Sequence, residues 1–211
     1  MMLGIAAIAT FVWLLLLRER LRMTWYVAFA LAILHVIYGV FCVRIFARME
    51  GADTGAMSLF GAVFLMPVAY YLGAKLSKRP MSEVFDIFGV AMIFTLLLAR
   101  CNCLHAGCCL GRYLFHTQMR WPTREAEILF YIVFLALMIP RVWKGKSKGR
   151  LYPLYMLAYG AFRAVVECFR VSDAQTLFHL SHVWAFLALG LGLSIYIEQT
   201  KHSKIHSRKR S

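Results

Sequence analysis

The stretch DIFGVAMIFTLLLARCNCLHAGCCLGR, from Asp86 to Arg112, decides the class of this protein. Its first part is an apolar run long enough for a membrane span, and its end carries four of the six cysteines, a histidine and two arginines. Charged groups close to hydrocarbon cost free energy and are retained mainly for function. Cysteine thiols add soft metal ligands and possible nucleophiles to these cations. The end of this segment is therefore the first place to look for chemistry.

The composition of the whole chain indicates an integral membrane protein. Of its 211 residues, 61% are hydrophobic and only 16% are charged, with a mean hydropathy of +0.66. Seven apolar segments are predicted to span the membrane: 2–17, 24–46, 57–74, 86–106, 126–142, 151–169 and 178–197. No polar segment is long enough to form a separate core. We expect one all-α, seven-span membrane domain over residues 1–200, followed by a basic cytoplasmic tail over 201–211.

The distribution of basic residues predicts the orientation of these spans. If the tail is cytoplasmic, sixteen of the 24 lysines and arginines lie on that side, including every lysine. An odd number of spans then puts the N-terminus outside, so the first segment is expected to be a retained helix. A cleaved signal peptide is the alternative. The net charge of +14 does not indicate a nucleic-acid binder, because the charges are dispersed among apolar spans.

The remaining basic residues are all arginines and fall at the outer ends of the predicted spans. They are Arg44, Arg48, Arg100, Arg112, Arg120, Arg124, Arg163 and Arg170. A planar guanidinium binds phosphate oxygens in a bidentate manner that lysine cannot match. The implied ligand is an anionic phospholipid, although three of these arginines are expected only to reach the interface, namely Arg44, Arg48 and Arg120.

A polar stripe runs along the sixth predicted span. Tyr155, Tyr159, Arg163, Glu167 and Arg170 recur at spacings of four and three, so one helix face carries them all. Facing lipid would cost Arg163 or Glu167 several kcal/mol, so the stripe is expected to face the protein interior or a water-filled cavity. Glu167 can pair with Arg163 or with an arginine of the cysteine-rich segment. A purely structural ion pair is the alternative.

A further acidic position lies in MRWPTREAE, residues 119–127. Pro122 starts a turn there, and Thr123 can cap the helix that follows. The helix dipole explains Glu125, whereas Glu127 enters the span itself and is a candidate functional residue.

Three segments of the chain resemble the prolipoprotein diacylglyceryl transferase family. YGAFRAVVECFRVSD, residues 159–173, is similar to the family segment Y-G-x-x-R-x-x-x-E-x-x-R, which puts Arg163 and Glu167 on its functional arginine and glutamate. MRWPTREAE puts Glu127 on a glutamate of the family. ARCNCLHAGCCLGR, residues 99–112, stands where the signature G-R-x-G-N-F-x-N-G-E-x-x-G-R is expected, and it matches at Arg100, Gly107, Gly111 and Arg112.

The chain also departs from the family at specific positions. Cys103 replaces the asparagine of the signature, and Cys108 replaces its glutamate. The histidine-containing H-G-G motif before the third span appears here as Ala56-Met57-Ser58. His35 or His182 could replace the missing histidine as a base, although a hydrogen-bonded structural role is the alternative for each.

The resemblance implies an enzyme of the bacterial plasma membrane with its active site on the outer side. The implied reaction moves the diacylglyceryl group of phosphatidylglycerol to the lipobox cysteine of a prolipoprotein. Catalytic roles are implied for Arg163, Glu167, Arg100, Cys108 and Cys103. Substrate-binding roles are implied for Arg112, Gly107, Gly111, Tyr159, Glu127, Arg124 and Arg170. Two alternatives stay open: a paralogous transferase that uses another lipid or acyl group and another acceptor, and a non-catalytic phospholipid-binding or redox-sensing membrane protein.

The cysteine cluster has four possible uses. A nucleophilic Cys108 would favour acyl transfer, because alkyl transfer to an enzyme thiol leaves a thioether, which is a very poor leaving group. No cofactor is expected except a possible zinc ion, with Cys101, Cys103, His105, Cys108 and Cys109 as candidate ligands that could activate an acceptor thiol. A disulfide is the third use, and close backbone packing of small residues is the fourth. The other two cysteines, Cys42 and Cys168, are expected in the core.

Overall fold

The computed structural model describes residues 2–51, 57–114, 118–147, 149–170 and 180–208, with side chains as far as residue 200. Ala56, Lys148, the end of the family-like segment at 171–173 and the basic side chains expected in the tail lie outside these described residues. The described chain forms seven helices, one in each predicted segment: α1 (Met2–Leu16), α2 (Trp25–Met49), α3 (Phe60–Leu76), α4 (Met81–Ala106), α5 (Thr123–Trp143), α6 (Leu151–Cys168) and α7 (Leu180–Arg208). The expectation of an all-helical protein is therefore confirmed.

Four of these helices, α2, α4, α5 and α7, are long and apolar enough to cross a membrane. α1 and α3 are shorter apolar helices. The boundaries differ most from the prediction at α4, which begins five residues earlier at Met81, and at α7, which continues to Arg208. The polar side chains Ser82 and Glu83 interrupt the apolar pattern at the start of α4, so hydropathy alone places that start too late.

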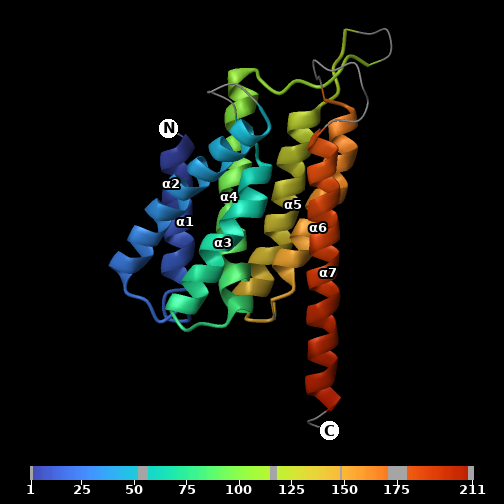
Figure 1. Ribbon diagram of the computed structural model, residues 1–211. Coiled ribbons are helices and arrows are strands. Elements are labelled where there is room, and N and C mark those ends of the chain that lie inside the picture. The colour runs from blue at the N-terminus through green and yellow to red at the C-terminus, as the bar shows by residue number, and fades with distance from the viewer. Residues whose placement is uncertain (1, 52–56, 115–117, 148, 171–179, 209–211) are drawn as a thin grey trace.

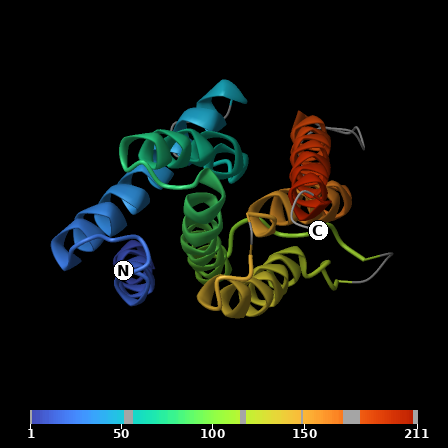
Figure 2. The same ribbon diagram turned by 90° about the horizontal axis from the view of Figure 1, so that it is seen from below.

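The helices stand side by side with α4 at the centre (Figures 1 and 2). α4 packs against α1 and α3 on one side and against α5 and α6 on the other, while α6 lies along α7. α1 begins and α7 ends at opposite ends of the bundle (Figure 1). We call the end at which α4 finishes at Ala106 the site end, and the other the distal end.

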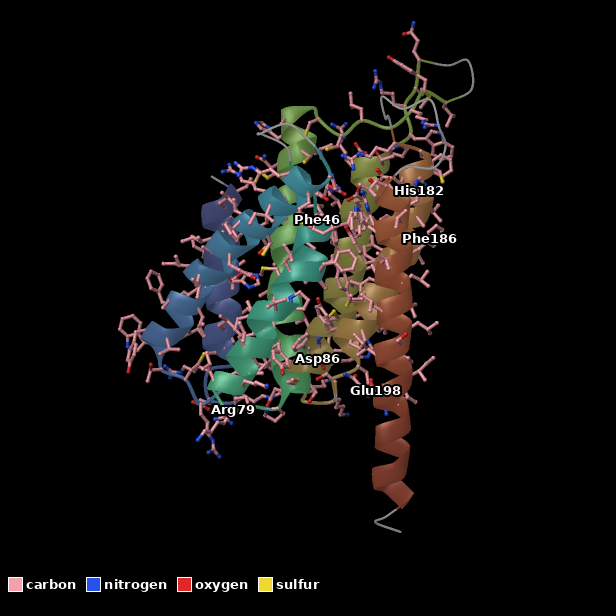
Figure 3. The ribbon with its side chains drawn as sticks, viewed as in Figure 1. Phe46, Arg79, Asp86, His182, Phe186 and Glu198 are labelled. Atoms are coloured by element: carbon pink, nitrogen blue, oxygen red, sulfur yellow. The ribbon has the colours of Figure 1, made fainter. Side chains whose placement is uncertain are left out.

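A buried carboxylate joins α4 to α6 at the distal end, where Figure 3 labels Asp86. Its two oxygens accept hydrogen bonds from the backbone amides of Gly149 (2.9 Å) and Tyr152 (3.0 Å), at the start of α6. Asp86 is fully buried, and such a group is stable only when its oxygens have partners. This contact fixes the position of α6 along α4.

The loop after α4 is tightly folded at the site end. Gly107 ends α4 with a φ of +70°, a conformation that glycine adopts without the usual steric cost. A few residues later, a Cβ atom at Gly111 would lie 2.1 Å from the carbonyl oxygen of Trp121, so only glycine fits there. The next amide, of Arg112, donates to the carbonyl of Phe169 at the end of α6 (2.7 Å). The loop therefore joins the ends of α4, α5 and α6.

Candidate active site

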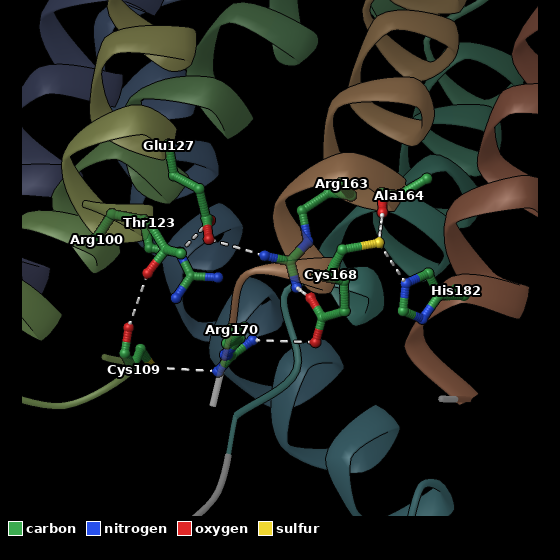
Figure 4. A network of polar contacts seen from close by, with 10 residues as sticks. Arg100, Cys109, Thr123, Glu127, Arg163, Ala164, Cys168, Arg170 and His182 are labelled. Atoms are coloured by element: carbon green, nitrogen blue, oxygen red, sulfur yellow. Dashed lines mark hydrogen bonds and ion pairs between the residues drawn. The ribbon is translucent and has the colours of Figure 1, made fainter. Parts of the chain in front are cut away.

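An ion-pair network of three arginines and two glutamates lies at the site end (Figure 4). Arg163 on α6 donates from Nη1 to Oε1 of Glu127 on α5 (2.8 Å) and from Nη2 to Oε2 of Glu167 one turn away (2.6 Å). Nε of Arg100 on α4 forms an ion pair with the other Glu127 oxygen at 2.5 Å. Nη1 of Arg170 lies 3.8 Å from Glu167 Oε1. Three helices thus contribute to one continuous chain of opposite charges.

The stripe predicted on the sixth span does face the protein interior. Tyr155, Tyr159, Arg163 and Glu167 are all buried, and only Arg170, past the end of α6, is partly exposed. The pairing within the network follows one of the two expected alternatives for Glu167, which binds Arg163. The arginine of the cysteine-rich segment, Arg100, instead binds Glu127, because α5 packs directly against α4.

The network carries a net positive charge and has donors to spare. Three guanidinium groups outnumber two carboxylates in it, and four of the five groups are at most 7% exposed. Among the described residues, Arg163 Nε and the Tyr159 hydroxyl are buried without a hydrogen-bond partner. A desolvated positive site with free N–H and O–H donors is suited to an anion such as a phosphate group.

A cavity of about 300 Å³ opens beside the network among α1, α2, α3 and α4. Its lining is mostly apolar and includes Met66, Met92 and Leu96, while Arg100 also borders it. The cavity lies on the side of α4 away from α5 and α6. The reason is that the face of α4 toward α5 and α6 is filled by the ion pairs and the buried tyrosines.

Three of the four clustered cysteines come together where α4 ends and the following loop folds back over it. The sulfur atoms of Cys103, Cys108 and Cys109 all lie within 4.8 Å of one another, and none is in a disulfide. Cys101 and His105, which were also candidate zinc ligands, are not part of this group. Each lies two residues from Cys103 on a helix, about 200° around its axis, so both point to another face.

The thiol of Cys109 contacts an arginine side chain. Nη2 of Arg170 donates to Cys109 Sγ at 3.2 Å. A hydrogen bond from the Cys103 thiol, together with the charges of Arg170 and Arg100, lowers the pKa of Cys109 below its ordinary value. The hydroxyl of Thr123 donates to the Cys109 carbonyl (3.3 Å) and does not cap α5. The thiol next to an arginine is therefore that of Cys109, one residue after Cys108, the candidate nucleophile of the sequence.

Two further candidate residues, Arg112 and Arg124, bind backbone carbonyl groups beside the network. Arg112 Nε donates to the backbone carbonyl of Arg170 at 3.0 Å, and Arg124 Nη1 donates to that of Cys108 at 3.5 Å. The three arginines that were expected only to reach the interface, Arg44, Arg48 and Arg120, are exposed.

A carboxylate that the sequence analysis overlooked also belongs to the site. Glu50 follows the last residue of α2, and its carboxyl group forms a hydrogen bond with Ser58, at the place of the family's H-G-G motif. Burial raises the pKa of Glu50 above its ordinary value, and Glu167 adds to this effect. Ser58, Arg163 and Arg170 oppose it. Glu50 is the one acidic residue between 20 and 52, a signal that was available in the sequence.

Cys168 is not a core residue as expected. It is half-buried at the end of α6, and its sulfur lies 3.4 Å from Nε2 of His182 at the start of α7. His35, the other candidate base, is buried in α2, where its ring stacks on Tyr70, and it borders the cavity. Residues 171–179 separate the two helices that carry Cys168 and His182, so spacing alone could not reveal their contact.

Comparison with known proteins places these residues in a family. The family described as prolipoprotein diacylglyceryl transferase matches residues 3–198 of the chain. A phosphatidylglycerol–prolipoprotein diacylglyceryl transferase of Dehalococcoides mccartyi is 22% identical over 164 residues, 70% of this chain and 63% of the relative. The enzyme of that name from Desulfotalea psychrophila is 24% identical over 184 residues, 74% of this chain and 64% of the relative.

A third relative of that name, from Photobacterium profundum, is 27% identical over 133 residues, 58% of this chain and half of its own length. The chain thus spans less than two thirds of the length of these curated relatives. The family match nevertheless covers almost all of the chain and includes the three segments whose side chains meet in the ion-pair network. The chain belongs to the prolipoprotein diacylglyceryl transferase family.

Proposed function

We propose that this protein transfers the diacylglyceryl group of phosphatidylglycerol to the thiol of a prolipoprotein cysteine. The ion-pair network supports this best, because Arg100, Glu127, Arg163 and Glu167 come from three separate family-like segments and meet in one place. The names of the relatives support the same donor and acceptor.

The donor phospholipid would bind across α4. Its phosphate would meet Arg100, which borders both the network and the cavity, with Arg112 and Arg170 as further cations. The buried hydroxyl of Tyr159 and Nε of Arg163 are additional donors. An acyl chain would enter the apolar cavity, whose volume accommodates part of one chain.

The proposed reaction is a displacement at carbon. The acceptor sulfur attacks the glyceryl carbon that carries the phosphate ester, a C–S bond forms, and the C–O bond breaks with its electron pair leaving on glycerol phosphate. The arginines stabilise the charge on the departing phosphate. Glu50 takes the proton of the thiol, because burial raises its pKa and makes its carboxylate a stronger base.

We further propose that all seven helices cross a bacterial plasma membrane with the site end outside. The start of α1 and the end of α7 lie at opposite ends of the bundle, and Arg79 lies at the distal end with the start of α4 (Figures 1 and 3). A reporter fused after Ser211 should therefore be cytoplasmic, and one inserted in the loop 113–121 should be external. Finding both on one side would contradict this topology.

The direct test of the function uses purified full-length protein, labelled phosphatidylglycerol and a lipobox peptide. The peptide should gain the mass of one diacylglyceryl group on its cysteine, and a serine version of the peptide should gain nothing. Release of glycerol phosphate should match the lipid transferred. Binding of the phospholipid without any transfer would instead favour a non-catalytic phospholipid-binding protein.

Replacing Glu50 with glutamine should lower the transfer rate by about 100-fold or more, because general-base catalysis typically contributes this much. A base acts only when deprotonated, so the activity of the unaltered protein should rise with pH through the raised pKa of Glu50. The Glu50→Gln variant should lose this rise. The matched control is Glu19→Gln, an exposed carboxyl at the distal end, which should keep both the rate and the pH profile.

One contact favours acyl transfer as a second candidate function. The hydrogen bond from Arg170 to Cys109 would stabilise a thiolate that attacks an ester carbonyl and forms a thioester. A hydroxylamine-labile lipid on Cys109 would establish this reaction. We expect none, because the family reaction is alkyl transfer and would not release its product from an enzyme thioether.

A further inference from the structure

We propose that Cys103, Cys108 and Cys109 bind one Zn²⁺ ion and leave a fourth coordination position for an external thiol. Three sulfur atoms of described residues meet within 4.8 Å, from the last turn of α4 and the loop that folds back over it. Around a zinc ion, with Zn–S bonds of about 2.3 Å, tetrahedral thiolates lie about 3.8 Å apart. The three side chains therefore need to move by only about 1 Å to reach this geometry.

The backbone holds the three thiols in this arrangement. The amide of Cys108 donates to the Cys103 carbonyl (3.2 Å), which turns the loop back onto the end of the helix. Cys109 has a φ of 57°, a left-handed conformation that is costly for a residue with a side chain and is kept where surrounding contacts impose it. Thr123 provides one such contact through the Cys109 carbonyl.

The number of thiols and their neighbours favour a metal over a disulfide. A disulfide would use two of the three sulfurs and leave the third unused, whereas a metal uses all three. Zn²⁺ with three thiolates carries one net negative charge, which the guanidinium of Arg170, 3.2 Å from Cys109 Sγ, can offset. Such outer hydrogen bonds orient thiolate ligands and tune a metal site. Zinc is preferred because thiolates are soft ligands that select it over hard cations.

The open position gives the site a role in the proposed reaction. Zinc sites with three protein ligands keep a fourth position for water or substrate. Cys103 and Cys109 border the same cavity as Arg100, so a thiol that binds the metal would lie close to the phosphate-binding arginine. This part rests on the proposed function: the acceptor thiol would bind as thiolate, its proton passing to Glu50, and would then attack the glyceryl carbon.

The test uses Co²⁺ as a spectroscopic probe on the purified full-length protein, kept reduced with a phosphine so that no small thiol competes. We expect one Co²⁺ per chain, with a thiolate-to-cobalt charge-transfer band, displaced by one equivalent of Zn²⁺. Adding a lipobox peptide should change this spectrum, and the serine version of the peptide should not. No thiolate-bound cobalt, or a spectrum indifferent to the peptide thiol, would overturn the proposal.

Single substitutions locate the site. Cys103→Ser, Cys108→Ser and Cys109→Ser each remove a ligand, so each should weaken Zn²⁺ binding by at least the roughly 10–100-fold that loss of an outer hydrogen-bond partner costs. The matched control is Cys101→Ser, which removes one thiol from the same helix end and should bind as tightly as the unaltered protein. Equal losses in all four variants would contradict the assignment, as would a Cys103 disulfide that persists in the reduced protein. Helix content measured by circular dichroism separates loss of ligand from loss of fold.

The test of the zinc site can succeed or fail independently of the test of the proposed function. Diacylglyceryl transfer by metal-free protein, with no metal bound at any concentration, would refute the zinc site and leave the proposed function standing. Metal binding that responds to the peptide thiol, without any diacylglyceryl transfer, would support the zinc site and refute the proposed function.

Discussion

Replacing Arg163 with lysine is expected to abolish most diacylglyceryl transfer. The guanidinium of Arg163 reaches Glu127 with one terminal nitrogen and Glu167 with the other. A lysine ammonium is a compact charge that cannot span both carboxylates, and it has no equivalent of Nε to offer a ligand. Loss of such a buried charged contact costs about 2–5 kcal/mol. At about 1.4 kcal/mol per tenfold change, the transfer rate should fall by roughly 30-fold or more.

The control for this experiment is Arg48→Lys, an arginine that is exposed at the end of α2. It should keep nearly full activity, because a solvated charge does not depend on the guanidinium fork. Both variants keep the positive charge, so a difference between them reports on geometry. Equal tolerance of lysine at the two positions would show that Arg163 acts as a generic charge.

Replacing Glu127 with leucine should produce the largest loss of stability. Glu127 is 3% exposed and is the shared partner of Arg100 and Arg163, which are themselves buried. Removing one partner of a buried ion pair leaves an uncompensated charge and typically costs about 3–5 kcal/mol. The midpoint of thermal unfolding in detergent or nanodiscs should fall accordingly, and transfer should be lost.

Glu125→Leu provides the comparison, since it removes a carboxylate two residues away on the same helix. Glu125 is 47% exposed and pairs loosely with Arg124 at 3.6 Å, so its loss should change stability by less than about 1 kcal/mol. A Glu127→Leu variant as stable as Glu125→Leu would mean that the network contributes nothing to the fold.

Much of the fold could be predicted from the sequence because lipid imposes simple rules. A segment surrounded by hydrocarbon must satisfy its backbone internally, so long apolar runs become helices, and all seven predicted segments did. Periodicity also predicted the buried face of α6, because Arg163 and Glu167 cannot face lipid. These inferences needed only one helix at a time.

The features that were missed depend on how helices meet. Whether Arg100 pairs with Glu167 or Glu127 is decided by the packing of α4 on α5, which no single segment reveals. The contact of Cys168 with His182 joins two helices across the intervening residues 171–179. The predicted group of metal ligands included Cys101 and His105, but these two residues lie on another face of α4 than Cys103.

The Asp86 contact determines how Arg100 and Arg163, at the other end of the bundle, are aligned with Glu127. Arg100 stands about 21 Å along α4 from Asp86, and Arg163 about 16.5 Å along α6 from Tyr152, at 1.5 Å per residue. Because the Asp86 carboxylate anchors both helices at their starts, these two lengths determine where each guanidinium stands against Glu127. A slip of one residue in α6 would rotate Arg163 by about 100° and carry it off its partner. The Asp86 contact at the distal end thus determines how the ion-pair network at the site end is aligned.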